Sequence, residues 1–472
     1  MSKQWLVFCV CIAFGYVFVA WLTQTESIQP NRPEESLFQT ALTDNVEINV
    51  DIKINVYQHW LNHCPEKHMS EFGPYKRFPP SNLSKTLPTI EEAVNHIVGE
   101  PPSQTWYANA LHHCNRTDIA GSRHINNIEQ TIKIKQDTFQ CFQAAHPYYS
   151  SENAYVKKLW FETQLLLVSR GYANETAILK FGDDWVKNDP HIPLLVKARP
   201  TFDTCLPADS ILRQDKFYSF PFFIHMQRFY GWDARRCARN FKHCETPIFR
   251  MKLPQRQFSI CIPFRAKADR VVWRGEQSGR PWDERDRNQY KDDCAAGGAF
   301  APRRMLLDRW GESDPAETGI DVGITRYHPE HYGPMDPSDA KVKAPVSMLD
   351  MLRNKFLLVL EGFDIPTSHQ WSMLSSSVVL MVPPTRESVA LHGLLKPWVH
   401  YIPLRFDFSD LQVQMRWCLE NLDDCEDIAQ RSSIFMYNLW VGSDFMNEVL
   451  SRVLRTYFSR FRKVVDCYCY KA

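Results

Sequence analysis

Charged residues follow several short apolar runs of this sequence, at the places where a strand would give way to a loop. Asp183 and Asp184 follow AILKFG, and Arg274 is the second residue of the stretch WRGEQSG. A carboxylate in such a place can take a proton from a substrate hydroxyl, and a guanidinium can bind phosphate oxygens. These residue types indicate a binding site for an anionic substrate with a candidate general base. The structural alternative is that Asp183 or Asp184 caps a helix entered at Trp185.

The WRGEQSG stretch has the residue types of an anion-binding loop. Gly275, Ser278 and Gly279 would let the backbone approach an anion closely and offer it N–H groups. Arg274 would add a planar fork of donors with a fixed charge. The alternative is a solvated turn with a surface arginine.

A second loop, LEGFDIPTSHQW, carries further candidate ligands. Glu361 and Asp364 could bind ribose hydroxyls. Thr367 and Ser368 stand near an expected helix start, where N–H and hydroxyl groups can bind a phosphate. The alternative for these residues is helix capping.

Composition and missing motifs exclude several classes of protein. The 472 residues carry 55 Lys and Arg against 54 Asp and Glu, a net charge of +1, which does not favour a nucleic-acid partner. The chain has no G-x-x-x-x-G-K-[ST], G-x-G-x-x-G, H-E-x-x-H or G-x-S-x-G motif and no kinase set. It also has no D-x-D triplet, so arginine and helix N-termini would have to neutralise a diphosphate.

The elements that would position these residues alternate along the chain. Helical patterns dominate residues 51–170, and Gly171 is placed to end a helix over 154–170. Helices are also expected over 347–354 and from about Asp407. Five strand–loop units are expected, at 175–185, 270–279, 355–364, 376–384 and 399–404. This alternation predicts an α/β fold with a mostly parallel sheet, whose ligands bind at the carboxyl edge.

The N-terminus contains one apolar segment, WLVFCVCIAFGYVFVAWL, over residues 5–22. As a helix it would be ~27 Å long, enough to cross a bilayer core. Lys3 precedes it and no Lys or Arg follows before Arg32, so the bulk of the chain is expected outside the cytoplasm. The segment is predicted to be an uncleaved anchor, with a cleaved signal peptide as the alternative.

Sequons and cysteines agree with export. Asn82, Asn115 and Asn174 begin Asn-x-Ser/Thr triplets. Of the 14 cysteines, 12 lie beyond the apolar segment, an even number suited to disulfides in an oxidising compartment. The spacings Cys237/Cys244 and Cys418/Cys425 suggest local disulfides, and a zinc site finds little support.

Residues 355–411 resemble glycosyltransferase family 90, which includes protein O-glucosyltransferases, capsule-associated xylosyltransferases and lipopolysaccharide-modifying enzymes. The phrases LEGFD, SSSVVLM, KPWVHYIPL and DFSDL occur in the family's order and spacing. WRG with a downstream Ser-Gly matches the preceding motif, and LKFGDDW and IPLLVKARP match more loosely. The resemblance spans about 178–433.

The resemblance implies a GT-B-like fold, in which two Rossmann-like domains face a cleft, here behind a single N-terminal transmembrane helix. The expected parts are a cytoplasmic tail (1–4), the anchor (5–22), a stem (23–50), an N-terminal acceptor-side domain (51–255), a C-terminal UDP-sugar-binding domain (256–450) and a C-terminal tail (451–472).

The resemblance also implies an inverting reaction that needs no metal and no cofactor. Asp183 is then the base that deprotonates the acceptor hydroxyl, with Asp184 as the alternative. Arg274 would meet the diphosphate, and Gly275, Ser278 and Gly279 would help to cradle it. The nucleotide pocket would be lined by Glu361, Asp364, Thr367, Ser368 and Glu387.

The chain departs from the family at two places. Phe363 stands where an Asn is common, and Ser368 and His369 stand where some members carry an arginine. The donor is expected to be UDP-xylose or UDP-glucose, and the acceptor a hydroxyl on a glycan or a protein serine. The C-terminus, CYCYKA, is not an ER-retrieval signal, so a single-pass type II protein facing the Golgi lumen is expected, with the ER as the alternative.

Two other functions remain open from the sequence. A non-catalytic family member would bind a glycan or a nucleotide sugar without turnover. This hypothesis is based on Phe363, which stands where the family commonly has an Asn. A cysteine-rich secreted module without a ligand is the other, although the arginine and aspartates at the strand ends argue against it.

Overall fold

The computed structural model divides the chain into residues 1–49 and residues 50–472. The residues that it describes all belong to the second unit. They are 87–99, 101–116, 131–134, 137–143, 163, 167, 170–179, 192–196, 198–200, 219–221, 262–276, 278, 302–326, 341–362, 365–366, 368–384, 386–440 and 445–470. Several predictions fall outside these residues: the anchor 5–22, the stem 23–50, Asn82, Asp183, Asp184, Cys237, Cys244, Gly279, Asp364 and Thr367.

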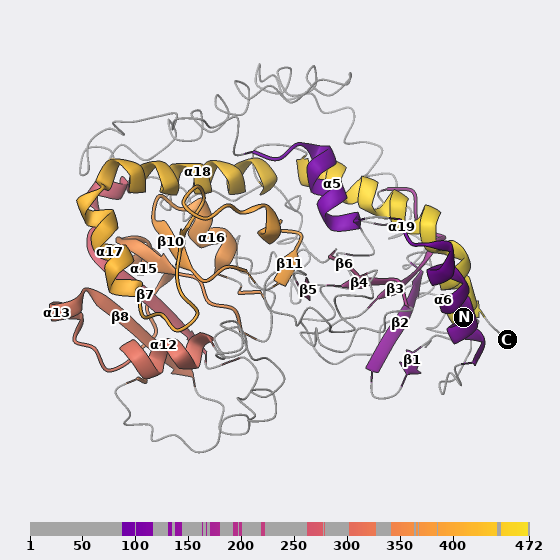
Figure 1. Cartoon of the computed structure of the whole chain (residues 1–472), viewed down its shortest axis with the longest axis horizontal. Helices are drawn as coiled ribbons and strands as arrows, with labels where there is room; N and C mark the ends of the chain where they lie inside the picture. Colours follow the sequence, from indigo (N-terminus) through magenta and orange to yellow (C-terminus); the bar gives the residue numbers. More distant parts are fainter. Residues whose placement is uncertain are drawn as a thin grey trace, which may run out of the picture. The chain divides into compact units, whose positions relative to one another are not determined.

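The C-terminal half contains a five-stranded sheet in the order β12-β10-β9-β7-β8 (Figure 1). Every neighbouring pair in it is parallel. The strands are β7 (Ala268–Glu276), β8 (Ile320–Arg326), β9 (Asn354–Leu358), β10 (Val378–Met381) and β12 (Ile402–Pro403). All residues of β9 and β10 are buried, which explains the apolar runs FLL and VVLM within them. The predicted parallel α/β sheet is therefore confirmed here.

Helices from the same half pack against this sheet. In contact with it are α12 (Pro302–Trp310), α13 (Pro315–Thr318), α15 (Met348–Leu352), α16 (His369–Leu374) and α18 (Leu422–Trp440), while α17 (Leu411–Glu420) packs on α18. Their apolar sides close a core with the strands around Leu306, Phe356, Leu380 and Ile428. The predicted helix at 347–354 is α15, capped by the Ser347 hydroxyl.

The N-terminal half contains a mixed sheet in the order β1-β2-β3-β4-β6. β1 (Thr131–Ile134), β2 (Asp137–Gln143) and β3 (Thr176–Leu179) pair antiparallel, whereas β3, β4 (Leu194–Val196) and β6 (Ser219–Pro221) pair parallel. The expectation that helices dominate residues 51–170 was wrong at β1 and β2. The Rossmann-like description fits the C-terminal sheet, and a GT-B arrangement of two domains stays a prediction.

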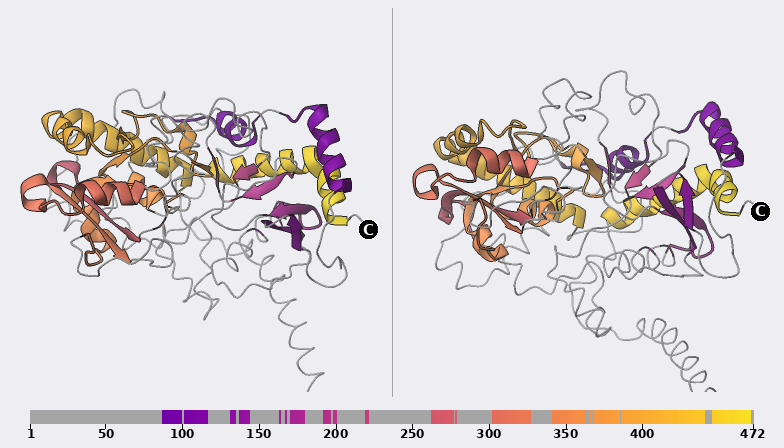
Figure 2. Two further views of the ribbon diagram at one scale, coloured as in Figure 1. Left: turned by 60° about the horizontal axis from the view of Figure 1, so that its bottom comes forward. Right: turned by 90° about the horizontal axis from the view of Figure 1, so that it is seen from below.

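The last helix of the chain, α19 (Phe445–Tyr470), packs against the N-terminal half. It runs beside α5 (Ile90–Val98) and α6 (Gln104–Arg116) in Figure 1, and it stays beside α6 in Figure 2. The Tyr457 hydroxyl accepts a hydrogen bond from Ile178 N at 3.0 Å and donates one to Pro193 O at 3.1 Å. Position 450, the expected end of the C-terminal domain, lies within this helix.

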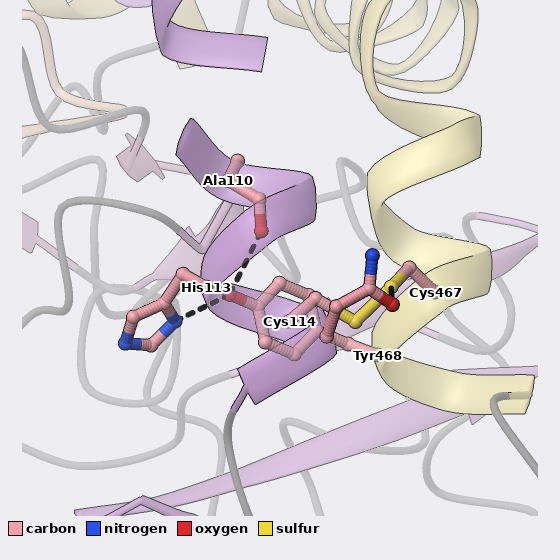
Figure 3. The surroundings of a disulfide bond; sticks show 6 residues. Ala110, His113, Cys114, Cys467 and Tyr468 are labelled. Atoms are coloured by element: carbon pink, nitrogen blue, oxygen red, sulfur yellow. Dashed lines mark hydrogen bonds between the residues drawn. A yellow bond between two sulfur atoms is a disulfide. The ribbon is translucent and has the colours of Figure 1, made fainter. Parts of the chain in front are cut away.

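Two disulfides tie the end of α19 to the N-terminal half. Cys467 pairs with Cys114 of α6, and Cys469 pairs with Cys141 of β2. Beside the first bridge, the Tyr468 hydroxyl lies 2.8 Å from His113 Nδ1 and 3.5 Å from Ala110 O (Figure 3). The predicted local disulfide between Cys418 and Cys425 is also present.

Two of the predicted sequons lie within the described residues. Asn115 is exposed in the last turn of α6, and Asn174 is exposed in the turn before β3. Both could therefore carry a glycan, and their glycosylation stays a prediction. Among the helices described between residues 87 and 470, none is long and apolar enough to span a bilayer.

Candidate functional site

The order of the parallel sheet fixes where a ligand would bind. Numbered along the chain, β8-β7-β9-β10-β12 corresponds to the order 2-1-3-4-5. The strand order reverses between β7 and β9, and doubly wound sheets bind ligands outside the carboxyl ends of the strands at such a point. The ends of these two strands lead into Glu276 and Glu361, so both predicted loops meet at this switch point.

Arg303 joins the two loops at the switch point. This half-buried residue is the second of α12, and its Nη1 donates to Glu276 O at 2.7 Å and to the Ser278 hydroxyl. Its Nη2 donates to Leu360 O at 3.3 Å, and its guanidinium lies 5.8 Å from the centroid of the Trp273 ring. One cation therefore holds the ends of β7 and β9 together and brings positive charge to this edge.

Gly362 lets the ends of the Ser278 and Arg303 side chains come close to its backbone, and a larger residue would push them away. A Cβ at this position would lie 2.6 Å from Ser278 Oγ and 2.9 Å from Arg303 Nη2. Glu361, the residue before it, is buried. Ser278, Glu361 and Gly362 are thus brought to one place.

Arg274 lies on the same strand but its guanidinium turns towards β8. Its Nη2 contacts Asp321 Oδ1 at 2.8 Å, its Nη1 donates to Asp321 O at 3.0 Å, and its Nε donates to Ala344 O at 3.2 Å. Burial acts to raise the pKa of Asp321, but Arg274 and Lys343 outweigh it and lower that pKa. Arg274 thus cross-links two strands, and its contact with a diphosphate stays a prediction.

The glycine at position 275 is explained by local packing without any anion binding. The ring of Trp273 lies against it, and a Cβ would come within 2.6 Å of ring atom Cζ2. Glycine is therefore required where the tryptophan folds back on its own strand.

Ser368 occupies the N-cap position of α16, yet its side chain makes no capping hydrogen bond. The Ser368 hydroxyl therefore does not cap α16, which was the alternative role for this residue. The next residue, His369, is buried, and neither of its ring nitrogens has a hydrogen-bond partner. Its ring stacks on that of His392 at 4.1 Å, and burial holds the pKa of both histidines below the usual range, that of His392 at about 4.

β11 (Arg386–Ser388) brings two further charges. Arg386 is buried and its Nη1 donates to Gly362 O at 3.3 Å, so it reaches the same edge. Glu387 turns the other way and contacts His96 of α5. The structure thus separates Glu387 from the groups at the switch point, and its place in a nucleotide pocket stays a prediction.

Sequence reasoning missed Arg303 and Arg386. Pro302 could have indicated the start of the helix that carries Arg303, but not the strand ends that Arg303 reaches. Arg386 gave no signal, because its contact with Gly362 depends on how β11 returns to the sheet.

No group of three or more metal-ligating side chains is found among the residues that the structure describes. The prediction of a metal-independent reaction is neither strengthened nor weakened by this. The cations that the described edge offers to an anion are those of arginine.

A parallel sheet with arginines and a glycine at its switch point has the arrangement in which α/β domains bind ligands. Comparison with known proteins points to a family. The family model "Glycosyl transferase family 90" matches residues 311–465, so this part of the chain is similar to glycosyltransferase family 90. The resemblance seen in the sequence is therefore confirmed.

Several curated proteins are similar to parts of this chain. The O-glucosyltransferase LpsA of Dichelobacter nodosus is 28% identical over 176 residues, covering 37% of this chain and 45% of the relative. Protein O-glucosyltransferase 1 of Rattus norvegicus is 32% identical over 159 residues, covering 34% of this chain and 38% of the relative. An uncharacterized protein, 027R, of Frog virus 3 is 32% identical over 144 residues, covering 26% of this chain and 15% of the relative. The chain therefore spans less than half the length of these relatives.

Proposed function

We propose that this protein is an inverting glycosyltransferase that moves xylose or glucose from a UDP-sugar to a hydroxyl of a glycan or a protein serine. One observation supports the proposal most strongly. At the switch point, Arg303 donates hydrogen bonds both to Ser278 and to the chain just after β9, beside Gly362. A leaving diphosphate needs positive charge and N–H donors at one fixed place. The family and the O-glucosyltransferase relatives support the same reaction.

In the proposed reaction, the acceptor oxygen attacks the anomeric carbon opposite UDP. The new C–O bond forms as the bond to the phosphate oxygen breaks, and UDP leaves with the electron pair. The hydroxyl proton passes to the carboxylate of Asp183, or to Asp184 as the alternative. The loop of Arg274, Gly275, Ser278 and Gly279 meets the diphosphate, and Arg303 holds that loop in place. The nucleotide would be bound by Glu361, Asp364, Thr367 and Ser368.

We also propose that residues 5–22 anchor the enzyme as a type II protein, with its catalytic part in the Golgi or ER lumen. The three disulfides of the described residues support an oxidising compartment. Protease protection of the C-terminal part in sealed microsomes, lost on adding detergent, would be the expected result.

The first test is UDP release by the purified full-length protein from a panel of UDP-sugars, with and without serine-containing peptides and oligosaccharides. We expect release from UDP-xylose or UDP-glucose. Asp183→Asn should lower it by about 10²–10⁴-fold while UDP binding survives. If Asp183→Asn retains full turnover and Asp184→Asn loses it, the base is Asp184.

The second candidate function is binding without turnover. Phe363 favours it, because it replaces the asparagine that is common in the EGND motif. UDP binding by calorimetry, with no release from any donor in the presence of acceptors, would support this function. If the protein neither binds UDP nor releases it from any donor, both proposed functions are contradicted.

A further inference from the structure

Glu387 is held by three elements of the fold. Its carboxylate is 3% exposed, and Oε2 contacts Nε2 of His96 on α5. The same oxygen accepts a hydrogen bond from the backbone N–H of Gly393 at 2.7 Å, in the 3-10 helix η5 (His392–Leu394). Oε1 accepts one from Ser388 N at 3.1 Å. Both carboxylate oxygens are thus used within the protein.

Gly393 leaves just enough room for this contact. A Cβ at this position would lie 2.5 Å from His96 Cε1 and 2.7 Å from Glu387 Oε2. The backbone of Gly393 does not have a positive φ, so alanine is compatible with its conformation. An alanine here would therefore act as a wedge that pushes the two side chains apart.

The strand that carries Glu387 is itself shared between the halves. β11 pairs antiparallel with β5 (Ala198–Pro200), and Glu387 lies opposite Arg199. One residue earlier, Arg386 donates to the carbonyl of Gly362 at the switch point. A line of contacts therefore leads from α5 through Glu387 and β11 to the edge where the donor is proposed to bind.

We propose that the His96–Glu387 contact is a positioning device: it fixes β11 so that Arg386 holds the Gly362 loop in the shape that binds the donor. This inference rests on the proposed function. It gives Glu387 a different task from direct contact with the ribose, because its carboxylate is buried and bonded to its neighbours. It also makes His96, which lies far from the switch point in sequence, a determinant of donor affinity.

The test uses the full-length protein with His96→Ala, which removes the partner, and Gly393→Ala, which inserts the wedge. Asn95→Ala is the matched control, because Asn95 is the neighbouring exposed residue of α5 and bonds Glu91. Two quantities are measured: amide hydrogen exchange at Ser388 and Gly393 without ligand, and the affinity for UDP by calorimetry. We expect both variants to speed exchange at these amides about tenfold and to weaken UDP binding about tenfold. The control should change neither.

Glu387→Gln separates this role from direct binding. If Glu387 contacts the nucleotide, this variant alone weakens UDP binding and His96→Ala and Gly393→Ala do not, which overturns the inference. Unchanged exchange in both variants overturns it as well. If the wild-type protein does not bind UDP, the proposed function fails, and the exchange rates still report whether the contact orders β11.

Discussion

At the scale of single residues, Arg303 and Arg304 offer a matched pair on one helix. Arg303 bonds Glu276 O and Leu360 O, whereas Arg304 lies in solvent with Asp308 at 3.5 Å. Because an exposed ion pair contributes little, Arg304→Ala should leave UDP affinity within about twofold. Arg303→Ala should weaken it by about tenfold or more, since the loop ends lose their common donor. Equal effects of the two variants on UDP affinity, measured by calorimetry, would contradict the assignment.

His369 allows a prediction on stability against pH. Its two ring nitrogens are buried without partners, and burial lowers its pKa and that of His392. Below pH about 6.5 the unfolded chain therefore binds more protons than the folded chain, so stability should fall as the pH drops towards 4. His369→Phe keeps a ring against His392 and removes both unbonded nitrogens. We expect it to raise stability at pH 7 by about 1–2 kcal/mol and to reduce the loss of melting temperature between pH 7 and pH 5. An unchanged pH slope would contradict this cause.

At the scale of elements, the strands show what a sequence can reveal. β9 and β10, which are buried along their whole length, and the buried centre of β7 were predicted because buried strand residues read as apolar runs bounded by polar loops. β1 and β2 were missed, although TIKI and TFQC alternate with the period of a strand. The loops after β7 and β9 were correctly recognised, yet the contact that joins them comes from α12. A position in sequence predicts a strand end, but not which distant side chain will reach it.

The amino edge of the parallel sheet carries a lysine without a carboxylate. Lys267 is buried and donates to the Ser377 hydroxyl at 2.6 Å, and burial holds its pKa well below the usual range. Between this lowered pKa and the ordinary pKa of lysine, the folded chain binds fewer protons than the unfolded chain, and the buried ammonium is costly, so Lys267→Met should stabilise the fold by about 1–2 kcal/mol. Lys355 at the same edge pairs with Asp269. Because Lys355→Met removes this ion pair, that variant should destabilise the fold. Thermal unfolding at pH 7 and pH 9 tests both, and the gain from Lys267→Met should shrink at the higher pH.

At the scale of the whole molecule, the end of the chain completes the core of its beginning. Leu450, Leu454 and Phe461 of α19 are fully buried in the cluster that contains Ile97 and Ile178. No local pattern predicts this, because a helix's apolar face does not say which sheet it will cover. The same holds for the cysteines: the spacing of seven between Cys418 and Cys425 indicated a bridge, whereas the partners of Cys467 and Cys469 lie over 300 residues away.

The two long-range disulfides of α19 should stabilise the fold more than the local disulfide does. Cys114–Cys467 closes 353 residues, whereas Cys418–Cys425 closes 7. In the chain-entropy model, losing one bridge that closes about 350 residues should cost roughly 6 kcal/mol, and losing the short one about 2. We compare the variant with serine at Cys114, Cys141, Cys467 and Cys469 with the variant with serine at Cys418 and Cys425. The first should show the larger drop in melting temperature and faster amide exchange in α5 and α6, because α19 then holds the N-terminal half by packing alone. A larger drop in the second variant would show that α19 needs no covalent tie.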